Sequence, residues 1–249
     1  MELSQFFKES PKVAVAFSGG VDSAYLLYAA LRYAAEVRAY YVKSAFQPQF
    51  ELEDARRMAA SLHADMTVLE ADVLSEPLVV QNPADRCYHC KKLLFSMIGD
   101  AARADGFSLL LDGTNASDDA SDRPGMRALR ELSVRSPLRE CGLTKADIRR
   151  LSKEAGLFTW DKPAYACLAT RIPCGTAITP EGLRRTEAAE TYLFSLGLSD
   201  FRVRLLGDAA RLQVPASQLP KVMEHRREIA EELKKQYSAV LLDLEVRDE

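Results

Sequence analysis

Near the amino end the sequence reads VAVAFSGGVDS over residues 13–23. Its first five residues form a short apolar run of the buried-strand type, and apolar residues then recur at helical spacing from Tyr25 to Ala34. The Ser-Gly-Gly turn therefore joins a strand to a helix, where glycine lets the backbone approach a ligand and the first helical N–H groups point outward. This arrangement predicts a phosphate-binding loop made of Ser18, Gly19, Gly20, Val21, Asp22 and Ser23.

The spacing of this loop excludes two common nucleotide-binding motifs. It lacks the lysine and the G-x-x-x-x-G-K-[ST] spacing of a Walker A loop, and it is not a G-x-G-x-x-G dinucleotide motif. The alternative to a phosphate loop is a tight strand-to-helix turn capped by serine or aspartate. The position between a strand and a helix favours the phosphate loop.

Strand and helix patterns alternate along the chain after this loop. The predicted elements are a strand at 37–42, a helix at 51–62, a strand at 66–69, a helix at 91–104 and a strand at 108–111. Such alternation predicts an α/β fold with a doubly wound parallel sheet covered by helices on both faces. Beyond it lie a polar loop at 112–125, a helix at 145–155 between Thr144 and Gly156, and an irregular stretch at 162–175.

The pattern changes near residue 177. Thr179 resembles the N-cap of a helix that runs to Leu196. After it come two alternating strands at 201–205 and 210–214, a charged amphipathic helix at 220–237 and a strand at 239–244. We therefore expect an α/β domain over residues 1–176 and a smaller α+β domain over 177–249.

Composition narrows the classes of function. The chain has 249 residues and a net charge of −3, with acids and bases interspersed, so the basic surface of a nucleic-acid binder is not expected. No apolar run approaches the ~20 residues of a membrane span, and the amino end does not resemble a signal peptide. We expect a cytoplasmic protein, in which the five cysteines are reduced.

Two of these cysteines have a spacing that suggests chemistry. Cys87 and Cys90 form a C-x-x-C pair at the expected start of a helix, beside Arg86, Lys91 and Lys92, which favour thiolates. The spacing admits ligands of a cluster or metal, a redox dithiol, a zinc site or inert cysteines. Cys167 lies in the irregular stretch and, taken alone, could also be a buried core residue.

The loop at residues 18–23 resembles the PP-loop of the ATP pyrophosphatase superfamily, which includes the GMP, NAD and asparagine synthetases. That resemblance implies an adenine nucleotide alpha-hydrolase-like fold. It also implies that the loop holds the β- and γ-phosphates of ATP while a substrate oxygen attacks the α-phosphorus. Asp22 would help to hold Mg²⁺. Ser44, after the second strand, is a candidate nucleotide contact, and its alternative is an ordinary serine at the end of a strand.

A closer resemblance covers residues 12–244. The strings that carry it are Asn82 to Lys91, LDGTN at 111–115, DRPG at 122–125, SPL at 136–138, KPA at 162–164 and TRIP at 170–173. In this order they resemble LarE, a family of ATP-dependent sulfur transferases. The resemblance implies that a carboxylate of pyridinium-3,5-biscarboxylic acid mononucleotide is adenylated and converted to a thiocarboxylate for the nickel-pincer nucleotide. Gly113, in LDGTN, is assigned to nucleotide binding.

The LarE family supplies sulfur in two ways. In one branch a cysteine gives up its own sulfur and becomes dehydroalanine, and on our alignment that position falls on Ala166. In the other branch three cysteines hold a [4Fe-4S] cluster, and Cys87, Cys90 and Cys167 match that pattern. Three thiolates leave one iron free to carry hydrosulfide. We favour the cluster, with Cys167 as a sacrificial donor as the rival.

An anionic acceptor calls for arginines, whose planar forks pair with two oxygens at once. Arg202 and Arg204 share one face of a predicted strand, and by resemblance they and Arg171 hold the phosphate of the substrate nucleotide. The alternative is a solvated basic strand face. Glu190 either orients an arginine or is a surface glutamate. Lesser candidates for contact with nucleotide or substrate are Asp122 and Arg123.

The remaining cysteines and histidine are given no role. Cys141 and Cys174 are read as small, partly buried apolar residues, with Cys174 as a spare ligand near Cys167. The side chain of His89 is expected to project away from a ligand shared by Cys87 and Cys90.

Two other classes of function remain as alternatives to a sulfur transferase. They are an ammonia-dependent synthetase of the NAD-synthetase type and a non-enzymatic iron–sulfur sensor. The resemblance also implies a homo-oligomer, such as a hexamer.

Overall fold

The computed structural model describes residues 2–118 and 124–247, which form two compact units. The first unit comprises residues 1–73 and 85–162, and the second comprises 74–84 and 163–249. The expected boundary at residue 177 lies within the second unit, because the irregular stretch after residue 162 is bonded to residues 80–82 and to the strand that begins at Arg202. Each unit is described by itself below.

A parallel four-stranded sheet forms the centre of the first unit, as the alternating pattern predicted. Its strands are β1 (Lys12–Ala16), β2 (Glu36–Lys43), β3 (Met66–Glu70) and β4 (Leu110–Leu111). The order is β3-β2-β1-β4, and Val15 of β1 pairs with both Ala39 and Leu111. After β1 the chain therefore adds β2 and β3 on one side of β1, and it then crosses to place β4 on the other side. In such sheets the carboxyl end of the strand at this crossing is the favoured ligand site.

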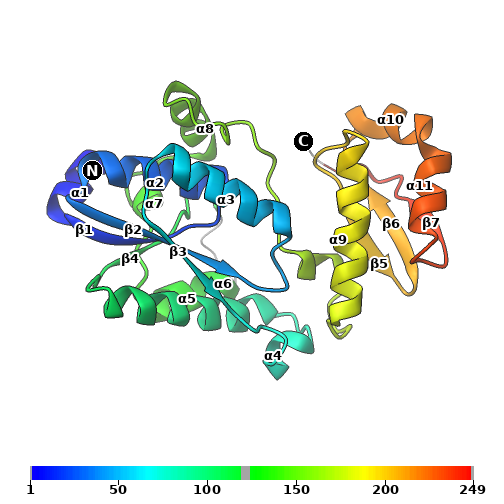
Figure 1. Ribbon diagram of the computed structural model, residues 1–249, viewed down its shortest axis with the longest axis horizontal. Helices are drawn as coiled ribbons and strands as arrows, with labels where there is room; N and C mark the ends of the chain where they lie inside the picture. The colour runs from blue at the N-terminus through cyan, green and yellow to red at the C-terminus, as the bar shows by residue number, and fades with distance from the viewer. Residues whose placement is uncertain (1, 119–123, 248–249) are drawn as a thin grey trace. The chain divides into compact units, whose positions relative to one another are not determined.

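Helices cover both faces of this sheet, as expected. They are α1 (Leu3–Glu9), α2 (Val21–Tyr33), α3 (Gln49–Ser61), α5 (Arg86–Ala104), α6 (Pro124–Glu131), α7 (Pro137–Glu140) and α8 (Lys145–Glu154). Figure 1 shows α2 and α3 on one side of the strands and α5 and α6 on the other. Apolar residues of β1 and α2 form the middle of the core, where Val15 and Leu26 are fully buried.

The second unit is a small α+β structure. Its sheet contains β5 (Arg202–Leu206), β6 (Ala209–Gln213) and β7 (Val240–Leu242), with β5 antiparallel and β7 parallel to β6. Its helical segments are α4 (Pro77–Val80), η1 (Leu168–Arg171), α9 (Pro180–Ser195), η2 (Ala216–Gln218), α10 (Leu219–Glu224) and α11 (Arg226–Leu233). Its apolar core includes Leu193 and Val203.

Two predicted helices differ in the structure. The helix expected from Lys91 begins at Arg86, because its first turn is held by a tertiary contact in which Tyr88 Oη donates to Glu131 of α6 at 2.8 Å. The single helix expected at 220–237 is two helices that meet at His225. The change of direction lets residues of both helices reach one core. No helix among the described residues has the length and apolarity needed to cross a membrane.

Candidate functional site

The predicted phosphate loop lies between β1 and α2, and a serine pair shapes it. Ser18 and Ser23 place their Oγ atoms 3.0 Å apart, and Ser23 Oγ accepts the Ser18 N–H and donates to the Gly20 carbonyl, each at 3.2 Å. Gly19 has a φ of +75°, and a Cβ on it would lie 3.1 Å from the Cα of Ala55 in α3. Only glycine fits this position without strain. No side chain of the described residues caps the amino end of α2, as suits an anion site.

Gly113, which follows β4, lies directly against this loop. A Cβ on Gly113 would be 3.0 Å from the Ser23 amide nitrogen and 3.2 Å from its Cα. Glycine is therefore required for β4 to bring the chain this close to the first turn of α2. The assignment of Gly113 to nucleotide binding stays a prediction, and its place beside the loop supports it.

Asp22, the proposed Mg²⁺ ligand, has two partners that the sequence did not identify. Lys145 Nζ donates to Asp22 Oδ2 at 2.6 Å, and Asn115 Nδ2 donates to Oδ1 at 3.3 Å. Lys145 is the first residue of α8, where the capping box of Thr144 and Asp147 fixes the helix start. Asn115 lay in the quoted LDGTN string without a role. The capping box was readable in the sequence, but its proximity to α2 depends on tertiary packing.

Ser44 makes local hydrogen bonds at the end of β2. It is 6% exposed, its Oγ donates to Gln47 Oε1 at 2.7 Å, and the same hydroxyl accepts the Phe46 N–H at 3.2 Å. These bonds shape the turn after the strand. A nucleotide contact by Ser44 stays a prediction.

The C-x-x-C pair lies in the first two turns of α5. Cys87 is exposed and Cys90 is partly exposed, and residues three apart lie on neighbouring positions of one helix face. Arg86 Nη2 donates to Cys87 Sγ at 3.4 Å. His89 Nε2 lies 3.3 Å from Asp85 Oδ2, so a contact with the residue four positions earlier engages its side chain. Thiolates are the ligands that an iron–sulfur cluster requires, so this pair fits one edge of a cluster site.

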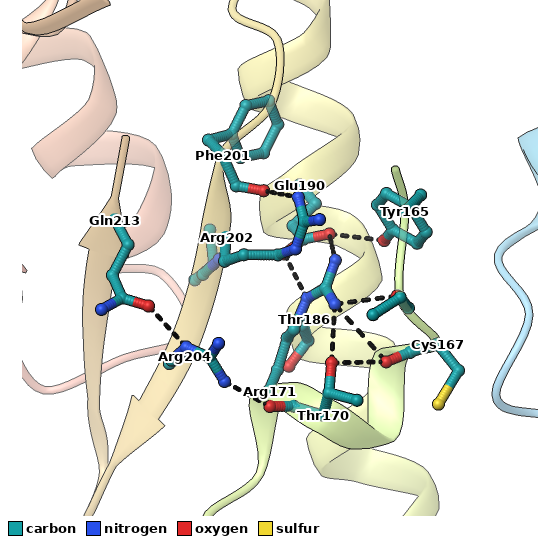
Figure 2. Close-up of polar contacts among 12 residues, drawn as sticks. Tyr165, Cys167, Thr170, Arg171, Thr186, Glu190, Phe201, Arg202, Arg204 and Gln213 are labelled. Carbon is teal, nitrogen blue, oxygen red and sulfur yellow. Dashed lines mark hydrogen bonds and ion pairs between the residues drawn. The ribbon is translucent and has the colours of Figure 1, made fainter. Parts of the chain in front are cut away.

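Cys167 belongs to the second unit and is partly exposed. Among residues 2–118 and 124–247, no group of three His, Cys, Asp or Glu side chains is gathered as a metal site. Cys167 immediately precedes η1, and Figure 2 shows its sulfur pointing away from the buried Arg171–Glu190 pair. The cluster with Cys87, Cys90 and Cys167 stays a proposal.

Arg171 and Glu190 form a buried ion pair at the centre of the second unit (Figure 2). Their side chains are 0% and 2% exposed, and the guanidinium donates through Nε and Nη2 to the two carboxylate oxygens at 2.8 and 3.0 Å. Glu190 also accepts the Val203 N–H at 2.9 Å. The alternative of a surface glutamate is therefore wrong. Burial alone would lower the pKa of Arg171, but its bonds to Glu190 raise that pKa above the ordinary value.

Arg202 and Arg204 share a face of β5, and both point their guanidinium groups at backbone carbonyls of the Cys167 segment. Arg202 donates to the carbonyls of Phe201, at 2.6 Å, and Ala164, and Arg204 donates to that of Thr170, at 2.6 Å. Burial and then the nearby Arg171 lower the pKa of both, to about 10 for Arg202. A solvated strand face is wrong for Arg202, which is 5% exposed. An anion here would relieve the repulsion between these cations.

Tyr165 is a member of this cluster that the sequence reading missed. Its hydroxyl donates to Glu190, and its ring centroid lies 4.6 Å from the Arg171 guanidinium carbon and 5.4 Å from that of Arg202. The ring therefore lies within cation–π distance of both guanidinium groups. No sequence signal marked it, because the pairing joins a loop to α9 and β5.

The other predicted residues have mixed outcomes. Cys141 is partly buried against the core of the first unit, and burial raises the pKa of its thiol. The expectation of a partly buried Cys174 is wrong, because Cys174 lies exposed in a turn in which Thr176 N–H donates to the Pro173 carbonyl. Asp122 and Arg123 lie outside the described residues.

Comparison with known proteins agrees with this geometry. Residues 5–116, which include β1, the loop and α2, match the asparagine synthase family. The chain is 36% identical over 225 residues to an uncharacterized protein of Synechocystis sp., covering 89% of this chain and 83% of that protein. It is 26% identical over 191 residues to the tRNA-specific 2-thiouridylase of Thermotoga maritima, covering 59% of this chain and 52% of that enzyme.

A further relative identifies the family. The pyridinium-3,5-bisthiocarboxylic acid mononucleotide synthase of Lactiplantibacillus plantarum, a LarE protein, is 36% identical to this chain over 214 residues. The match covers 85% of this chain and 78% of that enzyme. With its PP-loop α/β unit and a relative of this coverage, the chain belongs to the LarE family of ATP-dependent sulfur transferases.

Proposed function

We propose that this enzyme adenylates a carboxylate of pyridinium-3,5-biscarboxylic acid mononucleotide and converts it to a thiocarboxylate. The observation that carries the proposal is the cluster of Arg171, Arg202 and Arg204, three cations beside the carboxylates of Glu190 and Asp200. This cluster has the excess positive charge and the planar forks that suit a phosphate and carboxylates. The named activity of the Lactiplantibacillus relative supports the same substrate class.

The adenylation step belongs to the loop of the first unit. The loop from Ser18 to Ser23 holds the β- and γ-phosphates of ATP, and Asp22 helps to hold Mg²⁺. A carboxylate oxygen of the substrate attacks the α-phosphorus, the bond to the bridging oxygen breaks, and pyrophosphate leaves. The resulting acyl-AMP has a good leaving group at a carbonyl that otherwise resists attack. Ser44 and Gly113 are further proposed contacts of the nucleotide.

Sulfur transfer follows at the carbonyl carbon. Hydrosulfide attacks that carbon, the bond to the AMP oxygen breaks, AMP leaves and a proton is released. We propose Cys87, Cys90 and Cys167 as ligands of a [4Fe-4S] cluster, which when bound would offer one open iron for hydrosulfide. In the rival route the Cys167 thiolate attacks the acyl-AMP carbonyl, AMP leaves and a thioester forms. Loss of the Cys167 Cα proton then breaks the Cβ–S bond, which releases the thiocarboxylate and leaves dehydroalanine. A cytoplasmic location and a homo-oligomer belong to this proposal.

The test of the function is a mass measurement on the product. Protein purified without oxygen is mixed with ATP, Mg²⁺, sulfide and the pyridinium biscarboxylic acid mononucleotide. We expect pyrophosphate and a product in which sulfur has replaced one carboxylate oxygen. Pyrophosphate release without sulfur incorporation, or ammonia incorporated when ammonia replaces sulfide, would contradict the proposal.

The sulfur source is tested by iron and acid-labile sulfide content. We expect about four irons per chain in the wild type and loss of that iron in Cys87→Ser, Cys90→Ser and Cys167→Ser. Cys141→Ser is the matched control and should keep its iron, because Cys141 packs against the core of the first unit. A wild type without iron, whose chain becomes lighter by one H₂S after reaction, would instead establish Cys167 as the donor.

A further inference from the structure

The segment that carries Cys167 and Arg171 depends on outside partners for its backbone. Within residues 163–178 the described regular structure is the single turn η1. Buried carbonyls outside helices and strands must be satisfied by side chains or other backbone groups. Arg171 Nη1 donates to the Ala166 carbonyl at 2.8 Å, and Arg204 Nη1 donates to that of Thr170 at 2.6 Å. These bonds hold the first half of the segment.

Asn82 holds the second half. Its Nδ2 donates to the carbonyls of Ile172, Pro173 and Thr176 at 3.3, 2.8 and 3.1 Å. The backbone carbonyl of Asn82 accepts the Gly175 N–H at 2.8 Å. Asn82 is 2% exposed and has a φ of +54°, a left-handed backbone that asparagine tolerates better than most residues. Size, amide donor and backbone conformation together favour asparagine here.

We propose that Asn82 is a positioning residue that sets the place of Arg171 and Cys167 for sulfur transfer. Arg171 directly precedes Ile172, the first carbonyl that Asn82 holds, and Cys167 lies five residues before Ile172. In the sequence, Asn82 also lies five residues before Cys87. This inference rests on the function proposed above for its consequence in catalysis.

Two substitutions separate the amide from the backbone conformation. Asn82→Asp keeps the shape of the side chain and tolerates a left-handed backbone. It replaces the amide donor with a carboxylate oxygen, which cannot donate to the three carbonyls. Asn82→Gly keeps the backbone conformation and leaves those carbonyls without the amide. In both variants the segment should open more often, and we expect alkylation of Cys167 in iron-free, full-length protein to quicken about tenfold. Mass spectrometry also measures the alkylation of Cys141 in the same sample, and the rate of Cys141 alkylation should not change.

Val222→Ala is the matched structural control. Val222 is 5% exposed in the core of the same unit, so its loss should lower the melting temperature. It should leave the ratio of Cys167 to Cys141 alkylation unchanged. In turnover, the Asn82 variants should lose about tenfold in kcat while the KM for ATP stays the same, because the phosphate loop belongs to the other unit.

The alkylation ratio decides the inference independently of the proposed function. An unchanged ratio in both Asn82 variants, or an equal change in Val222→Ala, would overturn the positioning role. A wild type that makes no thiocarboxylate would remove the proposed function, but a tenfold rise in the ratio would still establish that Asn82 holds the segment.

Discussion

Asp22→Asn is expected to slow substrate-dependent pyrophosphate release by about 10²–10³-fold. Asparagine keeps the shape of the side chain but removes the negative charge that we assign to Mg²⁺ binding. Lys145, whose Nζ lies 2.6 Å from Asp22 Oδ2, would then face a neutral group. The measurement is the initial rate of pyrophosphate release with ATP, Mg²⁺ and the substrate mononucleotide.

Asp100→Asn controls for the loss of one carboxylate. Asp100 is a solvent-exposed residue of α5 that pairs with Arg103, so the rate should not change. Circular dichroism should be the same for both variants and the wild type. A rate for Asp22→Asn within about threefold of the wild type would contradict the role that we assign to Asp22.

Glu190→Gln is expected to lower the free energy of unfolding by about 3–5 kcal/mol. The substitution leaves Arg171 as a buried cation without its carboxylate, close to a second buried cation at Arg202. A buried charge that loses its partner is costly, because water cannot solvate it. Urea unfolding followed by circular dichroism gives the free energy, and hydrogen exchange of α9 locates the loss.

Glu181→Gln is the matched control on the same helix. Glu181 pairs with Arg184 near the start of α9, but both side chains are about two-thirds exposed. Exposed pairs contribute little, so we expect a change within about 0.5 kcal/mol. Equal effects of the two substitutions would show that the Arg171–Glu190 pair does not hold the second unit together.

Local patterns predicted the four strands of the first unit, its helices α2, α3 and α8, and α9 of the second unit, because neighbouring residues encode each of them, whereas α1, α6 and α7 were not predicted. The apolar run before Ser18 predicted β1, and the Thr144 and Thr179 caps marked the starts of α8 and α9. The C-x-x-C pair was expected at the start of a helix, but the helical pattern itself marked α5 only from Lys91, because the C-x-x-C turn has no apolar period and is held by a contact with α6. Helical period and caps are local signals, whereas that contact is not.

The same distinction between local sequence signals and tertiary contacts applies to the candidate site. The sequence alone determined a phosphate loop between strand and helix, a C-x-x-C at a helix start and two arginines on one strand face, since each depends on spacing within a few residues. Only the tertiary structure decided that Lys145 and Asn115 hold Asp22, that Gly113 packs on Ser23 and that Asn82 anchors residues 172–176. Those partners are distant in the chain, and only the packing of strands and helices brings them within hydrogen-bond distance.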